Sequence, residues 1–226
     1  MKIKWGALMV DGRGKIGGQV ASKNRGGAYM RNKVTPVNPQ TTFQTSIRSA
    51  FTVISQTWRT LTAAERLSFN SAVGNFSKTD IFGDIKNPSG ANLHERLNLN
   101  LFNIGQPYIT SAPPLGSAPI TFEFTMTANS TTGAVTISST MSIPAGFTAL
   151  VSLTTPQSAG RSFIKNQYRV VTTFTNTTTF PINIGTAYAA RLGALSSGSL
   201  LGCKIKVIDN ATGVNGQSYS ATTIII

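Results

Sequence analysis

The sequence predicts an α+β fold, in which a Gly-rich β-arm and a small helical unit precede an antiparallel, immunoglobulin-like β-sandwich. Three observations predict it: short β-prone pieces alternate with Gly-rich turns over 1–34, apolar residues take helical spacing over 35–105, and short alternating runs fill 119–226. A Pro-rich stretch at 106–118 predicts a linker before the β part. We therefore expect four segments with these boundaries.

The N-terminal arm carries most of the excess positive charge. The 226-residue chain has a net charge of +13, although only 12% of its residues are charged, about half the usual share. Residues 1–33 contain eight lysines and arginines against the single acid Asp11. A partner that recognises charge is therefore expected to bind this arm. The candidate partner-binding residues are Arg13, Lys15, Lys23, Arg25, Arg31 and Lys33, with Trp5 and Tyr29 as apolar anchors.

Glycines divide the arm into short strands. Asp11-Gly12 and Arg25-Gly26-Gly27 are turn sequences between runs that can pair as a small meander. The arm has too few apolar residues to bury a core alone, so it must lie against the rest of the chain or another molecule.

The arm also matches the dinucleotide-binding pattern G-x-G-x-x-G at Gly12, Gly14 and Gly17. That pattern has meaning only between a strand and a helix, with an acidic residue about 20 positions further on. Here the next residues (KIGGQV) favour a strand, and positions 31–33 are Arg-Asn-Lys. We therefore predict no nucleotide site at these glycines.

Three helices are predicted in 35–105. Asn38 is the expected N-cap of the first helix, with Pro39 at the first helical position, and Thr62 with Glu65 forms a capping box that opens a second helix ended by Gly74. A third helix is expected over about 89–103. The first helix carries a continuous apolar stripe that we expect to form core: Phe43, Ile47, Ala50, Phe51, Ile54, Trp58 and Leu61.

Seven β-like runs follow the linker at short spacing, which is typical of a sandwich. The runs are ITFEFTMT, GAVTISST, FTALVSLT, NQYRVVTTFT, TAYAARLG, CKIKVID and YSATTIII.

The chain has few residues that carry out catalysis. His94 is the only histidine, expected as an exposed or capping residue, and Cys203 is alone in a strand-like run. Asp80 and Asp84 are the only close acidic pair, and their spacing around Gly83 favours a polar turn over a cation site. No cluster has metal-ligand spacing. We therefore expect no enzyme, no cofactor, no metal and no small-molecule substrate.

Two classes of partner fit the basic arm. Cations interleaved with Trp5 and Tyr29 suit nucleic-acid phosphates and bases, but no known reader motif accompanies them. Basic tails also dock on acidic protein surfaces, which is the partner we favour. The start of the chain has no signal-peptide pattern and no stretch is long and apolar enough to span a membrane, so we expect assembly in a cytoplasm without a membrane partner.

A Gly-rich basic N-terminus followed by VNPQTTFQTSIRSAFTVISQTWRTLTAAERLSFN resembles small structural proteins of tailed phages of Bacteroidota hosts, specifically the auxiliary capsid proteins of crAss-like phages. The resemblance covers roughly residues 12–100. The residues that carry it are Asn38, Pro39, Gln40, Thr41, Gln44, Arg48, Phe51, Trp58, Leu61, Thr62, Glu65, Arg66, Phe69 and Asn70.

The resemblance implies a non-enzymatic virion protein that binds the major capsid protein or other virion proteins and stabilises or decorates the shell, after assembly in the bacterial cytoplasm. The alternatives are a packaged or host-side nucleic-acid-binding protein and a head-fibre or adhesin component. An adhesin should expose Tyr or Trp on the sandwich loops, but Tyr168 and Tyr188 fall in predicted strands, Tyr219 lies near one, and no Trp follows residue 58.

Overall fold

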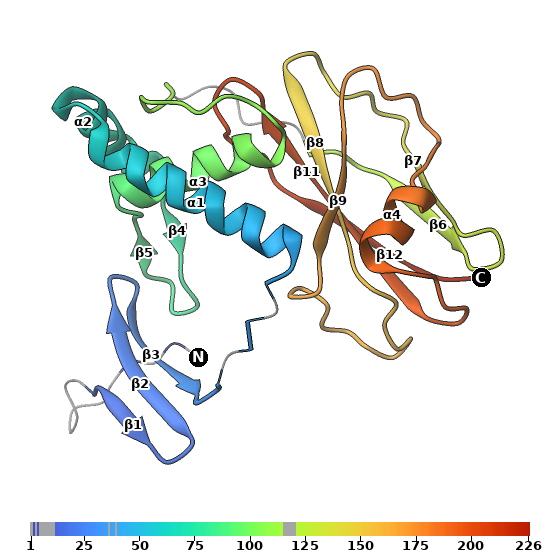
Figure 1. The fold of residues 1–226 in the computed structure, drawn as a ribbon, viewed down its shortest axis with the longest axis horizontal. Helices are drawn as coiled ribbons and strands as arrows, with labels where there is room; N and C mark the ends of the chain where they lie inside the picture. The colour runs from blue at the N-terminus through green and yellow to red at the C-terminus, as the bar shows by residue number, and fades with distance from the viewer. Residues whose placement is uncertain (1, 3, 5–11, 36, 39, 115–120) are drawn as a thin grey trace.

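The computed structural model describes residues 2, 4, 12–35, 37–38, 40–114 and 121–226. A helical unit lies beside a β domain, and a small N-terminal sheet lies below the helices in Figure 1. The C-terminus lies at the end of the β domain far from the helices. The described residues thus form four helices and four antiparallel sheets, none of them closed, which is a mixed fold consistent with the α+β prediction.

The chain forms its elements in three groups. The N-terminal strands are β1 (Gly14–Ile16), β2 (Gln19–Asn24) and β3 (Gly27–Asn32). The helical unit contains α1 (Thr42–Thr60), α2 (Ala63–Ala72), the 3₁₀ turn η1 (Val73–Phe76), β4 (Lys78–Thr79), β5 (Ile85–Lys86) and α3 (Gly90–Asn103). The β domain contains β6 (Thr125–Asn129), β7 (Ala134–Ser138), β8 (Phe147–Leu153), β9 (Arg169–Phe174), β10 (Ile182–Asn183), α4 (Gly185–Leu192), β11 (Leu200–Asp209) and β12 (Tyr219–Ile224).

The N-terminal meander is present, with strand order β1-β2-β3. Its first turn places Gly17 at a φ of 54°, and its second is helped by the Asn24 side chain, which accepts from the Gly26 N–H at 2.9 Å. Gly14 and Gly17 of the nucleotide-like pattern therefore belong to a β-hairpin that Gly12 precedes, and not to a strand-to-helix turn.

The helices begin largely where their capping residues predict. In the capping box of α2, Glu65 N–H donates to Thr62 Oγ1 at 3.3 Å and Thr62 N–H donates to the Glu65 carboxylate at 2.8 Å. The predicted cap of α1 was wrong: Thr41 is the N-cap, and Asn38 instead accepts a hydrogen bond from Arg48 at 2.7 Å. Pro39 lies outside the described residues. Gly74 does not end α2 with a left-handed residue, because the chain continues into η1.

The prediction that the whole α1 stripe is core was also wrong. Ala50, Ile54 and Leu61 are buried, but Phe43 is 57% exposed, and Ile47 and Phe51 are exposed too. The reason is length: the 19 residues of α1 span about 28 Å, whereas α3 with 14 residues spans about 21 Å. The first turns of α1, with Phe43, therefore extend beyond the helices that cover its second half. Phe51 lies in the middle of α1 and is exposed for another reason: it is rotated by about 100° from its buried neighbour Ala50 and lies at the edge of the buried face.

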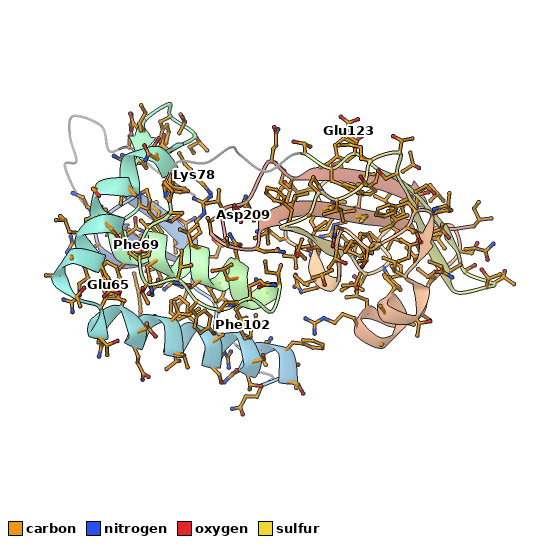
Figure 2. All side chains as sticks on the ribbon, turned by 90° about the horizontal axis from the view of Figure 1, so that it is seen from above. Glu65, Phe69, Lys78, Phe102, Glu123 and Asp209 are labelled. Carbon is orange, nitrogen blue, oxygen red and sulfur yellow. The ribbon has the colours of Figure 1, made fainter. Side chains whose placement is uncertain are left out.

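His94 lies in the core of the helical unit, contrary to the prediction of an exposed or capping residue. Its ring is fully buried, with centroid distances of 5.5 Å to Trp58 and 5.1 Å to Phe69. Figure 2 shows Phe69 among the helices. Neither imidazole nitrogen has a hydrogen-bond partner among the described residues, and burial lowers the pKa of His94. His94 therefore serves as a neutral aromatic side chain that fills the core.

Two antiparallel sheets share one apolar core in the β domain. Their strand orders are β10-β7-β6 and β12-β11-β8-β9. The alternating residues Phe122, Phe124 and Met126 and the inner face of β11 bury their side chains in the same cluster. The sheets meet where Ile226 N–H donates to the Ala128 carbonyl at 3.0 Å and Ser130 N–H donates to the Ile226 carbonyl at 2.6 Å. The C-terminal residues therefore join the edge of one sheet to the other.

One predicted strand is a helix. The run TAYAARLG forms α4, which buries Tyr188 in the core and ends at Gly193 with a φ of 90°. Alanine, arginine and leucine are strong helix formers, which favours a helix over a strand in this run. The short strand β10 precedes α4 and is not among the predicted runs.

The first part of the predicted linker is bound to the helices. The Asn98 side chain donates to the Ile109 carbonyl at 3.1 Å and accepts from the Ile109 N–H at 2.8 Å, and Ala112 N–H donates to Ser68 at 3.0 Å. Residues 115–118 of the linker lie outside the described residues. The segment up to Ala112 therefore belongs to the helical unit, although its composition is that of a linker.

We expect His94 to make folding sensitive to acid. The unfolded imidazole takes a proton near pH 6.5 whereas the folded one resists it, so the stability of the protein should fall as the pH drops below about 6.5. His94→Phe should remove this component, at about 1.4 kcal/mol for each unit by which the pKa is lowered. Urea unfolding at pH 7 and pH 5 measures it, and no other histidine is present to titrate. Parallel stability changes in the two proteins would contradict the assignment.

Candidate cationic interface

The meander places part of the predicted cationic set on one face. Val20 pairs with Lys15 on β1 and with Arg31 on β3, and directly paired residues of antiparallel strands share a face. Tyr29 is two residues from Arg31 and therefore lies on the same face of β3. It is half-buried, and its backbone forms an isolated β-bridge with Lys2. Lys15, Arg31 and Tyr29 therefore form one exposed basic and aromatic surface, which we call the meander face.

The other predicted residues lie around it. Lys23 lies on the opposite side of β2, Arg25 lies in the turn between β2 and β3, and Arg13 and Lys33 flank the sheet. All six predicted cations are at least partly exposed. Among the described residues, no carboxylate lies within ion-pair distance of Arg13, Lys15, Arg25, Arg31 or Lys33. Trp5 lies outside the described residues.

Two lysines attach the start of the chain to the hairpin β4–β5. Lys2 Nζ lies 3.7 Å from Asp80 Oδ2, and Lys4 Nζ lies 3.2 Å from Asp84 Oδ2. Asp80 closes the hairpin turn, because its Oδ1 accepts from the N–H groups of Phe82 at 2.8 Å and Asp84 at 3.1 Å. Burial opposes ionisation of Asp80, but these N–H groups and the charges of Lys2 and Lys86 lower its pKa overall. The acidic pair is therefore a polar turn, as predicted.

A basic cleft lies where the meander meets the helical unit. It has a volume of about 470 Å³ and is lined by the tip of β2–β3, by β4–β5 and by the start of α3. The described cations that line it are Lys2, Arg25, Lys78, Lys86 and Arg96. Asp80 is the only carboxylate among the described lining residues. We call these residues and the surrounding surface the cationic cleft.

Like charges face one another inside the cleft. Lys78 and Lys86 are direct cross-strand partners on β4–β5, an arrangement that destabilises a sheet. Lys86 has a weak ion pair with Asp84 at 3.9 Å, whereas no described carboxylate lies within ion-pair distance of Lys78. Arg96 lies over the Phe76 ring, 5.9 Å from its centroid. The positive charge of the cleft is therefore only partly neutralised by the described chain.

The start of α3 adds polar groups to the cleft. Ser89 is the N-cap and accepts from the Asn92 N–H at 3.2 Å, and the first turn of α3 contains no acidic residue. The N-terminus of a helix carries a partial positive charge and free N–H groups, which favour an anion. Asn87, Asn92 and Thr79 also line the cleft and offer neutral hydrogen-bonding groups.

Lys206 extends the cationic group to the β domain. Its amine lies on β11 and donates to Asn100 Oδ1 of α3 at 2.9 Å. Burial lowers the pKa of Lys206 to about 8, with further lowering by the charges of Lys204, Arg96 and Lys78. The charges of three cations, from β11, α3 and β4, therefore act on this partly buried amine.

Sequence reasoning missed the cleft residues beyond the arm. Lys78, Lys86 and Arg96 of the cleft and the nearby Lys206 are spread over almost 130 positions, and none belongs to a charge run. No pattern in the chain marks them, because the tertiary fold alone brings them together.

Other candidate chemistry has structural explanations. Cys203 is fully buried on β11, as predicted for a packed strand residue, and burial raises the pKa of its thiol. Within the described ranges, no group of three His, Cys, Asp or Glu side chains is placed to hold a metal ion. The helices described are all too short or too polar to cross a membrane.

Comparison with known protein families finds no family model that matches the chain, and comparison with curated protein sequences finds no match.

We expect Lys206 to give the fold an alkaline-side pH dependence. Between about pH 8 and pH 10.5 the unfolded amine keeps its proton while the folded amine loses it, so stability should rise with pH across this window. Lys206→Met should lack that rise, which amounts to about 1.4 kcal/mol per unit of pKa lowering. Urea unfolding at pH 7.5 and pH 10 tests it, with Lys165→Met as a control for the loss of one amine. Equal rises in all three proteins would contradict the burial of a charged Lys206.

Proposed function

We propose that the protein is a non-enzymatic structural component of a phage virion that binds the capsid shell, assembled in the bacterial host cytoplasm. Its partner would be the major capsid protein or another virion protein with an acidic surface. The observation that supports this best is the meander face, where Lys15 and Arg31 flank a valine and a tyrosine with no described carboxylate to neutralise them. Exposed cations around an aromatic side chain suit a charge-complementary protein interface.

The exposed start of α1 supports a second contact with the same shell. Phe43, Ile47 and Phe51 leave a large part of their apolar surface in solvent. The guanidinium of Arg191 on α4 lies over the Phe43 ring, so a positive charge accompanies this apolar part of α1. Exposed large apolar side chains that lie next to each other on a helix are typical of interaction sites.

We infer that residues 121–226 act as an immunoglobulin-like sandwich that projects from the shell or bridges neighbouring subunits. Two antiparallel sheets of three and four strands around one core support this role. The hydrogen bonds of Ile226 to Ala128 and Ser130 and the helix α4 are additions to such a sandwich.

A head-fibre or adhesin role has one observation in its favour. Tyr219 is 37% exposed and lines a cleft of about 360 Å³ together with Phe180, Glu123 and several hydroxyl side chains. Aromatic rings beside hydroxyl and carboxylate groups can bind a sugar by stacking and hydrogen bonds. This alternative predicts glycan binding that Tyr219→Ala abolishes.

We expect charge reversal on the meander face to prevent capsid attachment. Lys15→Glu with Arg31→Glu should weaken binding to shells of the major capsid protein at least about tenfold, because it places like charges against an acidic surface. Co-sedimentation with purified shells measures the bound fraction. Arg59→Glu with Lys165→Glu makes the same change in net charge on exposed residues elsewhere and should bind normally.

Three results would contradict the proposal. These are normal binding of the meander-face variant, normal capsid incorporation after deletion of residues 1–33, and absence of the protein from purified virions by mass spectrometry.

A further inference from the structure

We propose that the cationic cleft binds the phosphate backbone of a single-stranded nucleic acid. This inference is separate from capsid attachment, since the side chains that test it belong to the helical unit and not to the meander face. Lys78, labelled in Figure 2, and its strand partner Lys86 are the central residues.

The first argument is uncompensated charge. Arg25, Lys78 and Arg96 converge on the cleft from three elements, and no described carboxylate lies within ion-pair distance of them. Asp80, the only acid in the described lining, already accepts two N–H groups of its own turn and faces Lys2. A cluster of cations destabilises the fold by repulsion unless an anion neutralises it, so the cleft is arranged for an anion.

The cross-strand lysine pair gives a second, independent argument. A two-stranded sheet of this length is only marginally stable, and it still places Lys78 directly opposite Lys86. Lys206 of β11 is a second case, because the charges of Arg96 and Lys78 act on its partly buried amine and no described carboxylate lies within ion-pair distance of it. The chain therefore tolerates repulsion between cations at two adjoining places, and Lys78 belongs to both.

The neutral groups of the cleft favour phosphate over carboxylate. Ser89, Asn92 and Thr79 stand beside the N-terminus of α3, and hydroxyls, amides and helix N-termini are frequent phosphate-contacting groups. A phosphodiester chain also carries a charge on every nucleotide, whereas an acidic peptide matches this density only where acids follow one another without interruption. The density of cations in about 470 Å³ is therefore better matched by a phosphate backbone.

An aromatic side chain completes the site and indicates a single strand. The Phe76 ring lines the cleft next to Arg96, and an aromatic ring with a guanidinium is a platform on which an unpaired base stacks. Bases in a duplex are already stacked and would gain nothing from this platform. A positive groove combined with a stacking ring is the usual arrangement for sequence-independent binding of single strands.

The test uses the full chain and a fluorescein-labelled oligothymidylate of about 15 nucleotides, within the site sizes known for such grooves. Fluorescence anisotropy titrations between about 50 and 200 mM salt give the dissociation constant and its salt dependence. Lys78→Gln with Lys86→Gln should weaken binding at least tenfold and reduce the salt slope by about 1.4, because each phosphate that a lysine no longer neutralises lowers it by about 0.7. The same variant should be as stable as the wild type or more stable, because the repulsion is gone.

Two matched variants separate the cleft from general basic charge. Arg59→Gln with Lys165→Gln removes the same charge outside the cleft and should change binding less than twofold. Lys15→Gln with Arg31→Gln changes the meander face and should change it less than threefold. Should either variant lose as much affinity as the cleft variant, the cleft is not the site. Because the cleft variant leaves the meander face intact, its capsid binding reports on the proposed function independently.

Competition identifies the class of anion. Unlabelled oligothymidylate should displace the probe, whereas polyglutamate at equal charge should displace it at least tenfold less well. Equal displacement by polyglutamate would show an acidic protein segment to be the natural occupant and overturn the proposal. Binding to a duplex of equal length with the same affinity would also overturn it, because the Phe76 platform would then have no role. Arg96→Gln is a second variant that lies outside the β4–β5 hairpin. It should also weaken binding of the oligothymidylate, and normal binding by this variant would contradict a role of the Arg96–Phe76 platform.

Discussion

The close fit of the turn at Gly213 against α3 determines how the two halves of the molecule are placed. Gly213 has a φ of 70°, and a side chain there would collide with the Leu97 carbonyl and the Leu101 side chain. The Asn100 amide donates to the Gly213 carbonyl at 2.8 Å and its oxygen accepts from Lys206. Figure 2 shows Asp209, at the end of β11, where the β domain reaches the helices. A glycine is required here because only a bare backbone allows this approach.

α3 is consequently the element on which the cationic cleft depends. One face packs Leu93, His94 and Leu97 against α1 and α2, and Asn98 holds the segment after the helix. Its N-terminus and Arg96 line the cationic cleft, while its last turns meet the β domain. Buried amides on such a helix are costly unless they are paired, and Asn98 and Asn100 both have partners. The packing of α3 thus sets the positions of the charges that surround the cleft.

Local features of this fold could be predicted from the sequence, and tertiary ones could not. The capping box of α2, the span of α3 and the hairpin turns are encoded by residues a few positions apart, and the structure contains all of them. The exposure of Phe43 depends on the relative lengths of α1 and α3, and the burial of His94 depends on the rings that surround it. For the candidate site, the charged arm is evident from composition, but its cations divide between two sides of a sheet. The cleft could not be predicted, because its residues come from segments separated in the chain and no local pattern connects them.

The two cationic surfaces are mechanically connected through the start of the chain. Lys2 bridges Tyr29 of the meander and also reaches Asp80, while Lys4 reaches Asp84 on the same hairpin and lies 5.2 Å from the Phe82 ring centroid. Exposed ion pairs of this kind contribute little each, about 0–1 kcal/mol. The meander has no apolar core of its own, so these weak contacts hold the tip at Arg25 beside Lys78 and Arg96. An anion in the cleft would contact side chains of both the meander and the helical unit. Its binding would therefore stabilise the position of the meander in addition to these ion pairs. A ligand of the helical unit would in this way also fix the orientation of the meander face, because one short segment carries residues of both surfaces.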